Sequence, residues 1–270
     1  MSELILEFIQ YSSVFLLSYS VIIVAPFILI YFFYLNNLQH RAIIKTKKDD
    51  IKLKKVIYKN LTSLSVFISF IAIYVFCNHN DLNQTYTQIN GYGWGYFIFS
   101  VIAGILLHDA YFYFTHYLMH QFKFLHRFHA IHHQEIRPNP LSAFYFHPVE
   151  AIIQFVFFAA LPVFLPMHPA ALYFLVLWML ACNSAGHLSL EFYPSWLYKF
   201  PITRHWNAAT HHIMHHESGT SNYSIYYTWW DKLFKTLNPK YYERYQIVHH
   251  QIKTHKKNQN SLESGPAIKI

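Results

Sequence analysis

The sequence has few of the residues that form the surface of a soluble protein. Only 13% of its 270 residues are charged, and only seven are glycine. Soluble domains carry about 25% charged residues. Hydrophobic residues instead make up 54% of the chain, and aromatic residues make up 20%. This composition disfavours a soluble fold and predicts a multi-pass membrane protein.

Further absences argue against other classes of protein. Cysteine occurs only at Cys77 and Cys182, without a C-x-x-C motif, so neither a disulfide framework nor a thiolate metal site is indicated. No histidine stands four positions after His216 in the sequence His216-Glu217, so the H-E-x-x-H motif of zinc proteases is missing. The net charge of +8 does not follow the surface pattern of a soluble fold, and we expect no nucleic-acid partner.

Basic residues are confined to three segments, and the gaps between these segments set the topology. All 21 Lys and Arg residues fall within 41–59, 123–137 and 199–269. The cytoplasmic loops of membrane proteins are enriched in Lys and Arg. We therefore expect these segments and the C-terminus in the cytoplasm, and the N-terminus outside. We expect the membrane to be a bacterial inner membrane rather than the endoplasmic reticulum.

Apolar runs predict the membrane spans, each of which must cross about 30 Å of hydrocarbon. A 151–182 run is broken by three prolines, so we expect two helices with a turn near 162–169. The predicted fold is an all-α, integral membrane helical bundle of about four to five membrane-embedded helices with a cytosolic histidine-rich helical cap. The other expected spans run from Val14 to Leu35, from Leu61 to Phe76 and from Gly95 to about Phe114.

Histidine is the polar residue that the chain has in unusual number, with 20 in total. An H-x-x-x-H pair is followed by two H-x-x-H-H boxes, and these spacings place side chains on one face of a helix. Adjacent helical residues point about 100° apart, so the last two histidines of a box suit two neighbouring metal ions. The residues are His116 and His120, then His129, His132 and His133, then His212, His215 and His216.

His187 adds a ninth candidate imidazole to these eight. Nine ligands are too many for one ion and suit two ions with about four or five ligands each. Open positions on a redox-capable pair of ions could bind O2, and non-haem iron is the usual choice for that reaction. Zinc could take the place of iron in a structure, because imidazole binds both.

Several motifs around the histidines resemble those of the fatty acid hydroxylase superfamily, which includes the sterol desaturases. Asp109, Phe112 and Tyr113 resemble its D-x-x-F-Y motif, and 146–150 resembles its H-P-V-E segment. Asn222-Tyr223 resembles N-Y-G, and the sequence from Trp230 to Thr236 resembles W-D-R-L-F-G-T. Ser224 and Lys235 depart from this pattern, because they stand where the family usually has glycine.

The resemblance implies a non-haem di-iron enzyme that uses O2 to hydroxylate or desaturate a lipid. A sterol-like, isoprenoid or fatty acyl substrate is implied, with electrons from a separate donor of the cytochrome b5 or ferredoxin type. It divides the chain into an N-terminal membrane anchor with a basic cytosolic loop (1–94), a catalytic domain (95–240) and a polar tail (241–270), whose part from 246 we expect to fray.

Two carboxylates, Asp109 and Glu150, are expected to accept hydrogen bonds from ligating histidines. The alternative for each is a salt bridge to Arg127 or Arg137. His108 either lines the substrate end of the site or is a buried, hydrogen-bonded residue. The histidines close to the boxes but outside the pattern, which we expect to be structural or to orient the ligands, are His126, His205 and His211.

A metal-ion transporter is the competing function, because such proteins are also rich in histidine and cross the membrane several times. Transporters usually place their ligands near the middle of the bilayer. Here the boxes follow the ends of the expected spans, which favours an enzyme. Tightly held iron at two ions per chain would fit the enzyme, whereas weakly held, exchangeable metal would fit transport.

Overall fold

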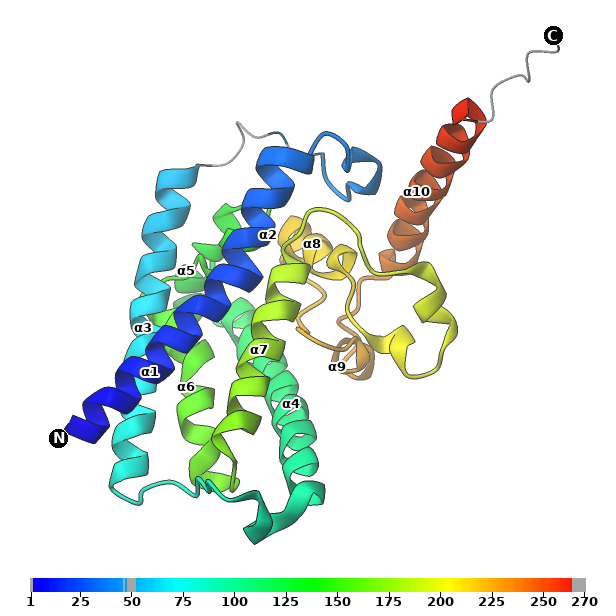
Figure 1. Ribbon diagram of the computed structural model, residues 1–270. Helices are drawn as coiled ribbons and strands as arrows, with labels where there is room; N and C mark the ends of the chain where they lie inside the picture. The colour runs from blue at the N-terminus through cyan, green and yellow to red at the C-terminus, as the bar shows by residue number, and fades with distance from the viewer. Residues whose placement is uncertain (1, 46, 48–51, 264–270) are drawn as a thin grey trace.

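Long apolar helices run side by side through the protein, as the computed structural model shows for residues 2–45, 47 and 52–263 (Figure 1). Within these residues, four helical segments are long and apolar enough to cross a membrane, and α6 (Pro148–Phe164) is a shorter apolar helix. The described residues contain no strand, which confirms the all-α prediction. The four segments are Glu3–Tyr34, α3 (Leu53–His79), α4 (Ile89–Gln121) and α7 (Pro169–Gly186).

The first of these segments is helical throughout but irregular. It consists of α1 (Ser2–Tyr19), a wider π-helical turn at Ser20–Val24, α2 (Ala25–Ile28) and a second π-helical turn at Leu29–Tyr34. Pro26 stands in the first turn of α2, and proline has no backbone N–H to donate to the preceding turn. Loss of that hydrogen bond accounts for the local widening of the helix.

The apolar run after the first histidines folds as the expected hairpin. Helix α6 ends at Phe164 and α7 begins at Pro169, so the turn lies where the prolines cluster. The loop that joins α3 to α4 covers this turn, because Gln84 N–H donates to the Pro162 carbonyl at 2.8 Å and Tyr86 N–H donates to the Met167 carbonyl at 3.2 Å. These segments form the end of the bundle that carries no Lys or Arg.

Aromatic side chains hold the bundle together. The Phe15 ring of α1 stacks on Phe67 of α3 with ring centroids 4.0 Å apart, and Phe67 meets Phe155 of α6 edge-on at 5.0 Å. Helices α4 and α7 approach closely at Gly104, where an added Cβ would lie 3.2 Å from a Leu175 methyl carbon. A side chain at position 104 would therefore require the Leu175 side chain to shift by a few tenths of an ångström.

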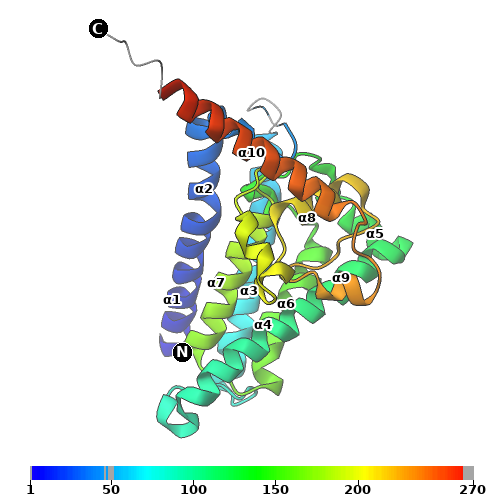
Figure 2. The ribbon, with the colours of Figure 1, turned by 90° about the vertical axis from the view of Figure 1, so that its right-hand side faces the viewer.

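Three short helices and one long helix form a cap beside the bundle (Figures 1 and 2). Two sequence expectations need correction here. The first H-x-x-H-H box is not one helix, because α5 ends at His129 and a 3-10 turn begins at His132. Residues 246–263 are not frayed but belong to the long helix α10, and residues 264–270 of the expected frayed tail lie outside the described residues. The cap helices are α5 (Lys123–His129), α8 (Ala209–Ser218), α9 (Trp229–Leu233) and α10 (Tyr241–Glu263).

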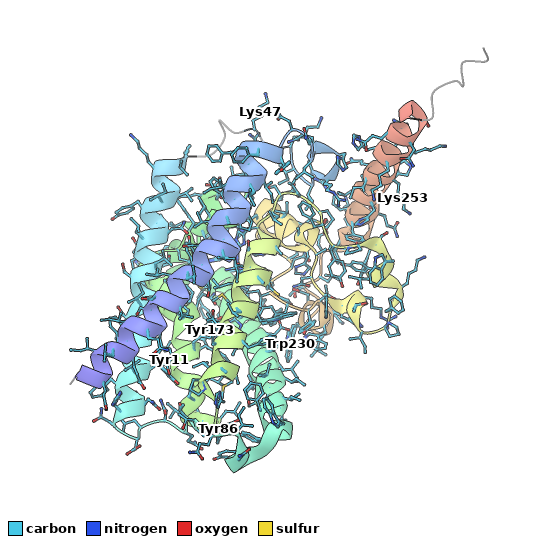
Figure 3. All side chains as sticks on the ribbon, viewed as in Figure 1. Tyr11, Lys47, Tyr86, Tyr173, Trp230 and Lys253 are labelled. Atoms are coloured by element: carbon cyan, nitrogen blue, oxygen red, sulfur yellow. The ribbon has the colours of Figure 1, made fainter. Side chains whose placement is uncertain are left out.

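The two ends of the bundle differ in charge. Figure 3 shows Lys47 and Lys253 toward one end of the molecule and Tyr86 at the opposite end. Figure 2 shows α10 passing across the end that carries these lysines. The separation of charge expected from the sequence is therefore present in the fold.

Candidate metal centre

All nine candidate histidines meet in two adjacent groups. Within each group, one ring nitrogen from every residue lies within 4.8 Å of the ring nitrogens of the others. The sequence predicted this set, and its role in binding metal stays a prediction. The first group is His116, His120, His129, His133 and His215, and the second is His132, His187, His212 and His216.

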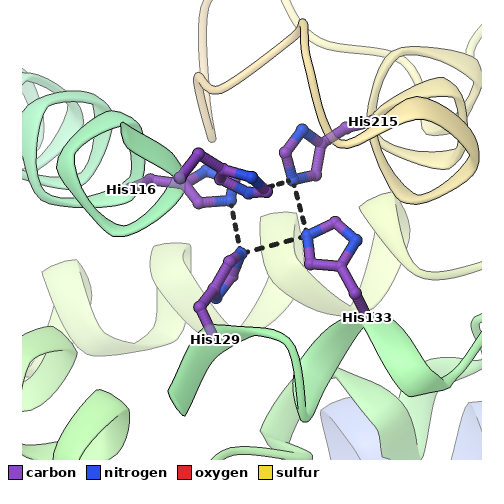
Figure 4. Close-up of side chains that lie close together, drawn as sticks. His116, His129, His133 and His215 are labelled. Carbon is purple, nitrogen blue, oxygen red and sulfur yellow. Dashed lines mark hydrogen bonds between the residues drawn. The ribbon is translucent and has the colours of Figure 1, made fainter. Parts of the chain in front are cut away.

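The first group gathers residues from four elements (Figure 4). His116 and His120 stand one turn apart on α4, as their spacing predicts. The Nε2 atoms of His129 and His116 lie 3.1 Å apart, and His133 Nε2 is 3.1 Å from His129 Nε2. His215 of α8 closes the group, with its Nε2 3.0 Å from His133 Nε2 and 3.2 Å from His120 Nε2.

The second group is built from the remaining members of the same boxes. His187 at the end of α7 has its Nε2 3.3 Å from His132 Nε2 and 3.2 Å from His212 Nε2. His216 Nε2 lies 3.1 Å from His212 Nε2. Adjacent residues of each box therefore belong to different groups, as the sequence analysis inferred from side-chain direction.

Backbone carbonyls fix which nitrogen of the rings faces the centre. Nδ1 donates to a carbonyl in three cases: His116 to Tyr223 at 2.7 Å, His187 to Asn183 at 2.8 Å, and His215 to Ser221 at 2.7 Å. A carbonyl only accepts, so Nδ1 carries the proton and the neutral ring turns an Nε2 lone pair inward. Lone pairs about 3 Å apart repel each other, and a cation between them turns that repulsion into coordination. The donor set therefore fits metal ions.

Glu150 orients a fourth ring. Its Oε1 accepts a hydrogen bond from His129 Nδ1 at 2.6 Å, and both side chains are almost fully buried. This is the contact that the sequence analysis expected for Glu150. A carboxylate in this position fixes the tautomer of the ring and increases the basicity of Nε2.

Asp109 has a different place from the one expected. Its two oxygens accept from Tyr226 N–H and Trp229 Nε1–H, each at 2.9 Å, and among the described residues it touches no histidine of either group. Asp109 therefore joins α4 to the start of α9 and to the segment just before it. The arginine salt bridge considered as the alternative is formed by neither Asp109 nor Glu150 within the described residues.

Asp231 was not among the residues predicted from the sequence to support the site. This buried carboxylate accepts from Tyr223 N–H at 2.8 Å and from Ser224 N–H at 3.1 Å, and it pairs with His211 Nε2 at 3.0 Å. Burial alone would raise the pKa of Asp231, but the His211 ring, with hydrogen bonds from Ser224 and Thr236, lowers it to about 2. The carboxylate holds the backbone of Tyr223, whose carbonyl in turn orients His116.

We expect Asp231→Ala to lower the free energy of unfolding by about 3–5 kcal/mol, because it leaves buried donors unpaired. The measurement is the thermal midpoint in detergent, with Glu217→Ala, which removes a half-exposed carboxylate, as the control. Equal midpoints for the two variants would contradict this role. Because the pKa of Asp231 lies below that of an unfolded Asp, the contribution is present above about pH 4 and is lost as the pH falls toward 2.

The remaining histidines near the boxes are structural. His108 is buried in α4, and its Nδ1 lies 2.8 Å from the Tyr226 hydroxyl, which matches the second of the two roles considered for it. The His126 ring packs against the ring of His120, with centroids 5.9 Å apart. His205 contacts Lys232 near the surface. None of these three, nor His211, joins a metal group in the described part of the chain.

Burial keeps the histidine rings of the two groups neutral at pH 7. It lowers the pKa of His133 and of His187 to about 4, and lowers the pKa of His212 further below the usual range with help from neighbouring rings. Unfolded histidines titrate near 6.5. Neutral imidazole is the form that binds metal.

A pH dependence of stability follows for the metal-free protein. Between about pH 6.5 and 4 the unfolded chain binds more protons than the folded chain. We therefore expect chelator-treated protein to lose thermal stability as the pH falls through this window, and to be unaffected above it. Metal-loaded protein should retain its midpoint to lower pH, because protons must then displace the ions. A metal-free midpoint that stays constant from pH 7 to pH 4 would contradict the expectation.

A mostly apolar cavity of about 340 Å³ reaches the second histidine group. His212 forms part of its wall, together with Trp178 and Asn183 of α7. Cavities of this size hold small, largely apolar ligands. An apolar ligand in this cavity would lie directly against a candidate metal ligand.

The two departures from the family pattern have different consequences. Lys235 adopts a φ of +58°, the left-handed conformation that glycine adopts without strain, so the loop keeps the expected shape at some steric cost. Ser224 lies in a loop held by Asp231 and is not among the residues with positive φ.

Comparisons with known proteins agree with this geometry. The model of the family described as "Fatty acid hydroxylase" matches residues 101–236, half of the chain. This range contains both histidine groups. No solved structure matches the chain.

Several curated relatives are similar over the same part of the chain. A Delta(7)-sterol 5(6)-desaturase of Gibberella zeae is 31% identical over 150 residues, which cover 54% of this chain and 44% of that protein. A C-4 methylsterol oxidase of Schizosaccharomyces pombe is 32% identical over 149 residues, covering 52% and 47%. A cholesterol 25-hydroxylase-like protein of Danio rerio is 31% identical over 145 residues, covering 52% and 56%. The chain spans about half the length of these relatives.

Proposed function

This chain belongs to the fatty acid hydroxylase family, and on that premise we propose that it is a membrane-bound di-iron oxidoreductase that uses O2 to hydroxylate or desaturate a lipid. The observation that carries the proposal is the convergence of nine histidines into two adjacent groups. The first group would hold one ion with five rings, and the second would hold the other with four. Iron would supply the activation of O2 and the removal of hydrogen from an unactivated C–H bond.

The protein's own contribution is to position these groups and to keep water away. Carbonyl acceptors and Glu150 hold the rings with Nε2 inward, so little reorganisation is needed when metal binds. The apolar cavity places a substrate against His212 and excludes water from the reacting C–H bond. Its mostly apolar wall supports a lipid over a charged metabolite.

The names of the relatives support a sterol-like substrate among the lipid classes expected from the sequence. The orientation that we propose places the lysine-bearing end, and with it the metal site, on the cytoplasmic side. The relatives named here are eukaryotic, so they give no support to the expectation of a bacterial inner membrane.

Lipid analysis tests the proposed reaction. Purified protein in lipid nanodiscs, loaded with ferrous iron and given a reductant and ¹⁸O₂, should convert a sterol-like lipid into a product that is heavier by one ¹⁸O atom or lighter by two hydrogens. Two tightly held irons per chain support the enzyme. Weakly held, exchangeable metal with no lipid product would instead support transport.

We propose that the electrons come from a separate protein, a cytochrome b5- or ferredoxin-type donor that docks on α10. Lys253, Lys256 and Lys257 of α10 are exposed at the basic end, so a donor with an acidic surface would be complementary to this helix.

We expect the triple change of these lysines to Glu to slow reduction by the donor about 10-fold or more at low ionic strength, with the difference lost at high salt. Stopped-flow reduction is the measurement. Lys54→Glu, which reverses an exposed charge on α3, is the control. A salt-independent loss would point to damage of the fold rather than to docking.

A further inference from the structure

The segment 195–204 exposes large apolar side chains in a part of the chain that crosses no membrane. Trp196 is 56% exposed, Phe200 is 53% exposed and Ile202 is 80% exposed. Two basic residues of the same segment, Lys199 and Arg204, are exposed beside them. Apolar side chains that gather on a surface mark an interaction site.

Internal hydrogen bonds give this segment a fixed shape. The Thr203 hydroxyl donates to the Leu197 carbonyl at 2.6 Å, and the Tyr193 hydroxyl donates to the Thr203 carbonyl at 2.6 Å. Two 3-10 turns, Ser195–Lys199 and Thr203–His205, complete the loop. The apolar side chains are therefore presented by a folded element.

The segment lies at the side of the helical bundle. Figures 1 and 2 share a vertical axis, and both show this segment and α9 below α10, at the height of the long helices. Helix α9 has the same surface character, with Leu233 67% exposed and Phe234 47% exposed next to the exposed Lys232. The segment 195–204 and α9 thus both present apolar and basic side chains at the depth of the membrane spans.

We propose that residues 195–204 and α9 insert into the boundary between headgroups and acyl chains of the bilayer that the long helices cross. Tryptophan and other large apolar residues favour this boundary, and Lys and Arg beside them reach the lipid phosphates. A protein that covered these residues would itself have to lie partly within the membrane. The bilayer therefore matches both the position and the chemistry of these residues.

The inner side of the same segment faces the candidate substrate cavity. Leu197 of this segment lines the cavity that His212 also lines, as do Tyr193 and Trp206, which flank the segment. A lipid could therefore pass from the bilayer into the cavity beside this segment, without crossing water. This role in entry rests on the proposed function, whereas insertion of the segment does not.

Spin labels measure the insertion directly. Single cysteines replace Ile202 or Phe200 in a full-length background that carries Cys77→Ser and Cys182→Ala, and the labelled protein is placed in nanodiscs of phosphatidylcholine and phosphatidylglycerol. Collisions with O2, which concentrates among acyl chains, are compared with collisions with a water-soluble nickel chelate. Leu17→Cys, exposed on α1, is the lipid reference, and Gln251→Cys, exposed on α10, is the water reference.

We expect the O2-to-nickel ratio at position 202 to approach that at position 17 and to exceed that at position 251 several-fold. A ratio at both 202 and 200 equal to that at 251 overturns the proposal. Two labelled positions guard against one variant that fails to fold. Since the measurement involves no turnover, it stands even if the proposed reaction is wrong.

The entry role has its own test. Ile202→Glu with Phe200→Glu should lower turnover of lipid embedded in nanodiscs several-fold while leaving the iron content unchanged. Unchanged turnover would remove the segment from the entry path.

Discussion

Replacing His215 with alanine is expected to abolish lipid oxidation and to reduce tightly bound iron from two ions to about one per chain. The reason is geometric. His215 Nε2 lies 3.0 Å from His133 Nε2 and 3.2 Å from His120 Nε2, so it closes the first group. Without it, the ion would lose its only ligand from α8 and would be open to water on that side.

The measurements are iron content by mass spectrometry and product formation in nanodiscs. His250→Ala is the matched control, because this histidine is exposed on α10 and belongs to neither group. Both variants should insert into membranes equally well. A fully active His215→Ala protein would remove His215 from the ligand set.

Replacing Glu150 with alanine is expected to weaken metal binding at the first group by about 10- to 100-fold. The change leaves the Nδ1–H of His129 without its acceptor in a buried site, so the ring is free to turn. Since both side chains are almost fully buried, water cannot readily replace the carboxylate. Activity should fall in parallel with occupancy of this group.

Titration of metal-free protein with Co²⁺, followed by its visible absorption, separates this effect from general damage. Glu150→Gln retains a carbonyl oxygen that can accept from His129, so it should bind metal more tightly than the alanine variant. The second group, which Glu150 does not touch, should bind normally in both variants. Equal weakening of both groups would indicate loss of structure instead of loss of orientation.

Sequence patterns that extend over many residues predicted the fold well. Apolar runs located the helices, and the three prolines at 162, 166 and 169 located the hairpin. The division of the histidines was also predictable, because neighbours such as His215 and His216 must point in different directions along α8. These inferences depend only on hydrophobicity and helical geometry.

The exact ends of helices and the hydrogen-bond partners of individual side chains were harder to infer. The spacing of His129 and His133 suggested one continuous helix, but α5 ends at His129 and the chain turns before His132. Asp109 and Asp231 are both acidic residues near histidines, yet only the folded chain shows that Asp109 binds the start of α9 and the segment just before it. Which carboxylate meets which partner depends on tertiary packing, and periodicity carries no information about it.

Three of the inward-facing rings are held by main-chain oxygens, at positions 183, 221 and 223. Every amino acid supplies that oxygen, so side-chain exchange at these places cannot delete it. A substitution at one of these positions therefore leaves the oxygen that holds the ring in place, although Asn183 and Tyr223 are buried and their own side-chain contacts would be disturbed. Insertions or deletions in the 219–223 turn would displace the carbonyl oxygens of Ser221 and Tyr223. They would therefore misalign the rings of His215 and His116.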